Sequence, residues 1–179
     1  MDQMSTHAAK TSISVDKRNW SPSLLPGQIV LVSTRDTQDR PNIAPKSWVT
    51  MVALCGPIVA FGCNVNHTTY QAIAESHEFA VNIPDASLAG RTWRLMNYHG
   101  AGRLEHGGFT LMPAQKIGAP LIAECRAHVE CVFDSEKRYG DEVMVFGRIV
   151  AASADADCLR GAAPDQYLSL RPVFFPRAP

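Results

Sequence analysis

The sequence from residue 124 to residue 152 reads ECRAHVECVFDSEKRYGDEVMVFGRIVAA and decides the class of fold. Apolar residues at positions 125, 127, 129, 131 and 133 alternate with polar residues at positions 124, 126, 128 and 130. A period of two over this length is typical of a half-buried antiparallel β-strand. We interpret residues 134–142 as a polar turn and residues 143–152 as the return strand. The segment therefore favours a β-rich fold built from hairpins.

Upstream of this segment, runs rich in apolar and β-branched residues predict four further strands, at residues 28–34, 42–54, 57–63 and 78–83. The second run contains Pro45, which cannot donate to a ladder and therefore belongs on an edge or at a bulge. Helical spacing predicts helices over residues 67–76 and 86–98, and the glycine-rich stretch 99–108 is interpreted as a loop. Several strands, hairpin-like links and few helices predict a small barrel with helical insertions.

Length and composition narrow the class of protein. A chain of 179 residues with 46% hydrophobic residues predicts one domain, over residues 21–179, preceded by a polar arm over residues 1–20. Seventeen basic residues balance seventeen acidic ones, which argues against nucleic acid as a partner. No apolar run has the length of a membrane span or a signal peptide, so we expect no membrane association.

The five cysteines are odd in number and contain no CxxC pair. Four of them fall in apolar or alternating segments, which suits reduced, buried thiols in a cytoplasmic protein. His99, His106 and His128 lack the spacing of metal ligands, so no metal site is expected.

Residues 42–50, NIAPKSWVT, are the first candidate for ligand binding. A strand interrupted by proline leaves main-chain groups without ladder partners, and these groups must be paired. A flat heterocycle could pair them, with the hydroxyls of Ser47 and Thr50 assisting and Trp48 as an apolar wall. The same pattern also fits an edge strand whose free groups meet water.

Residues 64–70, NVNHTTY, join a buried strand to a helix and are the second candidate. Unpaired N–H groups and a partial positive charge make a helix N-terminus a site for anions. Thr68 and Thr69 could donate hydroxyls to phosphate oxygens, and His67 could add charge if protonated. The alternative is ordinary N-capping by Asn66.

Residues 31–84 together resemble the N-terminal core of the flavin reductase-like, FMN-binding split-barrel family, which includes the flavoredoxins. The resemblance rests on the order and spacing of LVST at 31–34, NIAP at 42–45 followed by Ser47 and Trp48, Pro57, HTTY at 67–70 and EFAVN at 78–82. Residues 119–125 and 130–131 resemble the long barrel strand of the family. This likeness implies a six-stranded antiparallel split β-barrel of Greek-key topology, assembled as a homodimer with FMN near the subunit interface.

The resemblance also implies an NAD(P)H-dependent flavin oxidoreductase with FMN, rather than FAD, as its cofactor. Such a protein needs no catalytic acid or nucleophile, because the flavin itself accepts the hydride. Its electron donor would be a small molecule or a redox protein. The residues expected to hold the flavin are Ala44, Pro45, Lys46, Ser47, Trp48, Val49 and Thr50 at the ring, and Asn64, Asn66, His67, Thr68 and Thr69 at the phosphate.

Two departures from the family pattern leave the activity open. Many NAD(P)H-using members carry a histidine just after the glycine–acid pair of the late hairpin, where this chain has Gly140, Asp141 and Glu142. The stretch 97–111 is also short, so the tail at residues 171–179 could cover the opening from a partner subunit or act as a surface strap. The alternatives are therefore a reductase, an FMN-carrying electron-transfer protein without efficient NAD(P)H activity, and a flavin-free split-barrel interaction domain.

Overall fold

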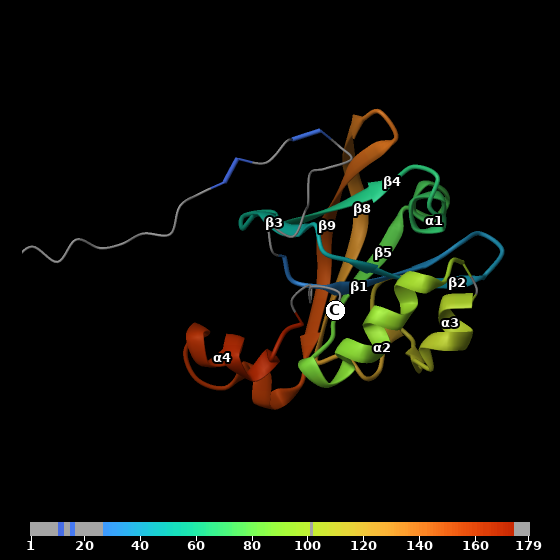
Figure 1. Cartoon of the computed structure of the whole chain (residues 1–179). Helices are drawn as coiled ribbons and strands as arrows, with labels where there is room; N and C mark the ends of the chain where they lie inside the picture. The colour runs from blue at the N-terminus through green and yellow to red at the C-terminus, as the bar shows by residue number, and fades with distance from the viewer. Residues whose placement is uncertain (1–10, 13–14, 17–26, 101, 174–179) are drawn as a thin grey trace, which may run out of the picture.

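The computed structural model describes residues 11–12, 15–16, 27–100 and 102–173 (Figure 1). The N-terminal arm expected at residues 1–20 therefore lies almost wholly outside the described residues. Within the described ranges, no helix is long and apolar enough to cross a membrane.

A seven-stranded antiparallel sheet forms the body of the structure, in the order β2-β1-β5-β8-β9-β4-β3. A short ribbon of β6 and β7 accompanies it. The strands are β1 (Val30–Arg35), β2 (Pro41–Lys46), β3 (Val49–Ala53), β4 (Ile58–Asn64), β5 (Glu78–Ile83), β6 (Leu111–Met112), β7 (Leu121–Ile122), β8 (Ala127–Tyr139) and β9 (Glu142–Ala154).

The two edges of the sheet come from one continuous stretch of chain. β2 pairs with β1 at one edge, and β3 pairs with β4 at the other. Only Ser47 and Trp48 separate them, so the chain bends there and joins the two edges into a split barrel. The run predicted as one strand over residues 42–54 is thus two strands, which explains seven strands where six were expected. Pro45 lies on edge strand β2, as predicted.

Strand β1 is buried on both faces. Val30 and Val32 point into the barrel, where they cluster with Phe61 and Phe79, whose rings meet edge to face at 5.2 Å. Leu31 points the other way, into a second cluster with Ile43, Leu88, Leu95, Phe109, Ile122 and Cys125. Burying each large side chain contributes about 1.5–3 kcal/mol, so both clusters hold β1 in place, and the second also holds β2 through Ile43.

The long hairpin of β8 and β9 rises beyond the rest of the sheet (Figure 1). The turn predicted over residues 134–142 is wrong, because both strands continue and only Gly140 and Asp141 form the loop. Gly140 has a φ of 64°, which glycine adopts without strain. Residues 134–139 of β8 are largely exposed, so this part of the strand lacks the alternation that marks a half-buried strand.

Helix α1 (Thr68–Ser76) confirms the helix predicted over residues 67–76. The single helix predicted over residues 86–98 is wrong, because the segment divides into η2 (Ala86–Leu88), α2 (Ala89–Arg94) and η3 (Leu95–Asn97). At each end of a short helix, such tighter 3₁₀ turns give hydrogen-bond partners to the main-chain N–H and C=O groups that the helix leaves unpaired.

The loop predicted over residues 99–108 contains a helix, α3 (Gly102–Gly107). Arg103 Nε donates to the carbonyls of Tyr98 at 2.8 Å and Leu95 at 3.3 Å, so tertiary contacts overcome the low helix propensity of the glycines. The chain then continues through the sheet to η4 (Ala156–Leu159) and α4 (Ala163–Leu170).

The start of the C-terminal tail lies against its own chain. The N–H of Ile29 donates to the carbonyl of Val173 at 2.7 Å, and the N–H of Ala86 donates to the carbonyl of Arg171 at 2.9 Å. Residues 171–173 therefore act as a strap, whereas the rest of the tail, residues 174–179, lies outside the described residues.

Candidate functional site

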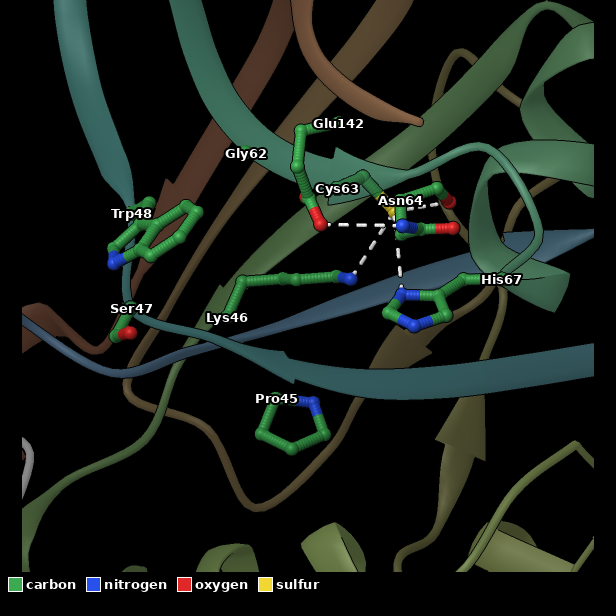
Figure 2. Close-up of a pocket in the computed structure, with 9 residues that line it drawn as sticks. All are labelled: Pro45, Lys46, Ser47, Trp48, Gly62, Cys63, Asn64, His67 and Glu142. Carbon is green, nitrogen blue, oxygen red and sulfur yellow. Dashed lines mark hydrogen bonds between the residues drawn. The ribbon is translucent and has the colours of Figure 1, made fainter. Parts of the chain in front are cut away.

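A cavity of about 270 Å³ opens where the bend between β2 and β3 faces the end of β4 and the start of α1 (Figure 2). It joins the two segments that the sequence singled out separately. Its lining residues are Pro45, Lys46, Ser47, Trp48, Gly62, Cys63, Asn64, His67 and Glu142. Six of these nine were predicted, and Gly62, Cys63 and Glu142 were not.

Trp48 and Gly62 form the apolar wall. Trp48 is 52% exposed, and its indole lies against Gly62, where an added Cβ would come within 2.7 Å of the indole Cε3. The N–H of Gly62 also donates to the carbonyl of Trp48 at 2.7 Å. The missing side chain at position 62 therefore lets the indole lie flat on β4, which leaves the ring beside the cavity free to contact a ligand.

Lys46 brings a cation into the centre of the cavity. Its Nζ donates to Cys63 Sγ at 3.2 Å, and His67 Nδ1 lies 3.9 Å from the same sulfur (Figure 2). Burial lowers the pKa of His67, and the charges of Lys46 and Arg103 lower it further, whereas Glu142 opposes them. The positive charge of this site at neutral pH therefore comes from Lys46, not from His67.

Asn64 and Asn66 hold the turn before α1. Asn64 Nδ2 donates to Glu142 Oε1 at 3.1 Å, and Asn64 Oδ1 accepts from the N–H of Asn66 at 3.0 Å. The prediction that Asn66 caps the helix is wrong, because the N-cap residue is His67 and its side chain makes no capping bond. The first turn of α1 is thus left without a side-chain cap.

The free N–H groups of α1 lie beside the cavity. The first intrahelical bond runs from the N–H of Gln71 to the carbonyl of His67 at 3.1 Å, so residues 68–70 precede the helical ladder. Thr68 is exposed at this end. The phosphate contact predicted for the Thr69 hydroxyl is wrong, because Thr69 is fully buried and its Oγ1 accepts from Asn42 Nδ2 at 3.2 Å.

Three predicted ring contacts do not bring their side chains to the cavity. Ala44 is 1% exposed and pairs with Val32 in the sheet. Val49 packs against the barrel core. The exposed Thr50 donates its hydroxyl to the carbonyl of Met51 at 3.2 Å. These positions build the two strands rather than the cavity wall.

The sequence model of the family described as "Flavin reductase like domain" matches residues 23–169. The chain belongs to this family. Membership assigns it to the flavin-related oxidoreductases at the level of the family. Within the described part of the chain, no group of three or more His, Cys, Asp or Glu side chains is placed to hold a metal ion.

Individual relatives of this flavin reductase-like protein are distant. An uncharacterised protein of Pyrococcus abyssi is 27% identical over 127 residues, which cover 71% of this chain and 74% of the relative. The flavoredoxin of Desulfovibrio vulgaris (Miyazaki F) superposes with a TM-score of 0.70 at 22% identity, covering 88% of this chain and 80% of its own. Nitrilotriacetate monooxygenase component B from Bacillus cereus superposes with a TM-score of 0.76 at 19% identity, covering 92% and 91%. These two likenesses establish the split-barrel fold.

Proposed function

We propose that this chain binds FMN and transfers a hydride from NAD(P)H to the flavin. The observation that carries the proposal is the joining of Trp48, Lys46 and the uncapped start of α1 around one cavity. Trp48 would contact a flat ring, Lys46 would meet a negative charge, and the start of α1 would bind a phosphate. The flavin reductase-like family supports the same chemistry.

The residues of the cavity fit the parts of FMN. The isoalloxazine ring would pack against Trp48 and Pro45, and the phosphate would accept bonds from the hydroxyl of Thr68 and the free N–H groups of residues 68–70. Lys46 Nζ would stabilise negative charge on the reduced ring, because a fixed cation favours the anionic form. When bound, the flavin supplies the hydride acceptor, and the chain orients the two rings and excludes water.

Glu142 favours a second candidate, an FMN-carrying electron-transfer protein. Its carboxylate lines the cavity at the position where the family pattern leads us to expect a histidine beside the nicotinamide. A carboxylate there repels an anionic dinucleotide, so a protein partner could deliver electrons in place of NAD(P)H.

We also propose that the chain works as a homodimer in the cytoplasm. The outer side of edge strand β3 and its flanks carry Trp48, Met51, Val52 and Leu54, each at least half exposed. A second copy that covers this apolar surface would place the subunit interface beside the flavin cavity, because Trp48 belongs to both. Five free cysteines, four of them buried, suit a reducing compartment.

Titration with FMN followed by anaerobic reduction tests these candidates. We expect saturable quenching of flavin fluorescence at one FMN per chain. NADH or NADPH should then bleach the visible absorbance of the oxidised flavin. Binding without bleaching by either nucleotide would reject the reductase and keep the carrier. Absence of FMN and FAD binding would reject both and leave a flavin-free interaction domain.

A further inference from the structure

Lys46 holds its ammonium group in the flavin cavity without a carboxylate partner. Its Nζ donates to Cys63 Sγ at 3.2 Å, and among the described residues this is the one hydrogen bond of the ammonium (Figure 2). An ammonium carries three N–H donors, so the other two remain for a ligand. A lysine side chain has many rotamers of similar energy, so the contact with Cys63 decides where the charge stays.

Glu142 is the competing partner for this ammonium. Its carboxylate lines the same cavity, yet within the described part of the chain it forms no ion pair with Lys46. Asn64 Nδ2 donates to Glu142 Oε1 at 3.1 Å, and Figure 2 shows Glu142 directed at Asn64 while Lys46 is directed at Cys63. Opposite charges attract strongly at close range, so a lysine released from Cys63 would turn to Glu142. The Cys63 thiol and the Asn64 amide therefore keep the cation and the carboxylate apart.

The sulfur of Cys63 has a fixed place. Cys63 lies on β4, between β3 and β9 in the sheet, and is 3% exposed as part of the barrel core. Its Sγ donates to the carbonyl of Asn64 at 3.6 Å, which leaves a sulfur lone pair to accept from Lys46. A close-packed side chain on a strand keeps one rotamer, whereas a lysine stem has many. Cys63 therefore positions Lys46, and not the reverse.

We propose that Cys63 is a positioning residue whose thiol holds the Lys46 ammonium in the cavity, away from Glu142, and thereby raises the redox potential of the bound flavin. A cation beside the ring stabilises the negative charge of the reduced flavin more than the uncharged oxidised ring. The same cation paired with Glu142 would lose most of this effect, because the carboxylate cancels its charge. This inference rests on the proposed flavin binding and adds to it a residue that sets the electronics of the site.

The midpoint potential of the FMN-loaded full chain, measured by equilibration with a dye of known potential, tests this assignment. We expect Cys63→Ala to lower the ratio of reduced to oxidised flavin at a given potential about tenfold, which is about 30 mV for a two-electron couple. The Kd of oxidised FMN should change less than about threefold, because the oxidised ring carries no charge for Lys46 to meet. Cys63→Ser keeps an acceptor for Lys46 and should stay within about 10 mV of the parent.

Cys131→Ala is the matched control. Cys131 is 0% exposed in the same barrel core and does not line the cavity, so its loss should destabilise the protein and leave the potential unchanged. Glu142→Gln tests the competition itself, because Cys63→Ala should change the ratio less than about twofold once the carboxylate is gone. Cys63→Val, which fills the place of the sulfur without an acceptor, replaces Cys63→Ala if the alanine variant does not fold.

Three results would overturn the role of Cys63 and leave FMN binding intact. They are an unchanged potential in Cys63→Ala or its valine replacement, an equal fall in Cys63→Ser, and an equal fall in Cys131→Ala. A fall of the same size with Glu142→Gln present would overturn the competition between the two acceptors. Failure of the unsubstituted protein to bind any flavin would instead overturn the proposed function.

Discussion

Substitution of the two adjacent threonines at the start of α1 should separate flavin binding from stability. Thr68 is exposed at the free N–H groups, so Thr68→Ala removes a hydroxyl donor to phosphate and leaves the packing intact. A hydrogen bond to a charged group contributes about 1.5–3 kcal/mol, which corresponds to roughly a 10- to 100-fold weaker Kd. We expect the melting temperature of this variant to stay within about 1 °C of the parent.

Thr69→Val should instead lower the melting temperature and leave flavin affinity nearly unchanged. The substitution removes one of the two acceptors of Asn42 Nδ2 and places a methyl group beside a buried amide. The cost is about 1–3 kcal/mol, or roughly 3–10 °C in melting temperature for a chain of this size, with flavin affinity nearly unchanged. Calorimetry and flavin titration on the same samples measure both effects.

Thr50→Val is the matched control, because the Thr50 hydroxyl donates to the neighbouring carbonyl of Met51 on an exposed strand, and the substitution should change neither quantity. Our assignment of the phosphate to the start of α1 would be refuted if Thr68→Ala kept full flavin affinity. It would also be refuted if Thr69→Val weakened flavin binding without lowering the melting temperature.

Three further perturbations follow from the geometry. Gly147→Ala would bring its Cβ within 2.6 Å of Phe79 Cε1 and closer still to Cζ, so overpacking should cost about 1–3 kcal/mol and lower the urea midpoint; an unchanged midpoint would contradict the packing. The phosphate of a bound flavin should raise the low pKa of His67, so that binding takes up a proton. Flavin affinity should therefore rise as the pH falls from about 8 to about 6.5, and His67→Gln should flatten that dependence. Burial lowers the pKa of His128, so the unfolded chain, with a pKa of about 6.5, binds more protons and stability should fall between about pH 7 and pH 5; His128→Asn should lose this slope in urea titrations.

Much of the fold could be predicted because its strands carry a readable pattern. The alternation before Phe133 identifies the buried half of β8, and the apolar run ending at Cys63 identifies β4. The distal half of β8, residues 134–139, could not be predicted, because it is largely exposed and carries no hydrophobic period. Helix α3 also escaped prediction, since the side chain of its Arg103 bonds to the carbonyls of Leu95 and Tyr98, which lie outside the helix.

The site could be predicted only where neighbours in sequence are neighbours in space. Residues 45–48 and His67, which line the cavity, each belong to a short segment of this kind. Glu142 did not, because its place depends on the register that pairs it with Asn64 across β9 and β4. The burial of Thr69 had a local signal that could have been used. Thr69, Ala72 and Ile73 share one face of α1 at helical spacing, and that face is buried.

A crystal structure of the flavin-loaded protein tests the central claim most directly. We predict density for the isoalloxazine ring against Trp48 and Pro45, near Lys46 Nζ, with a phosphate at the N–H groups of residues 68–70. Flavin bound elsewhere, or a phosphate away from the start of α1, would contradict the account.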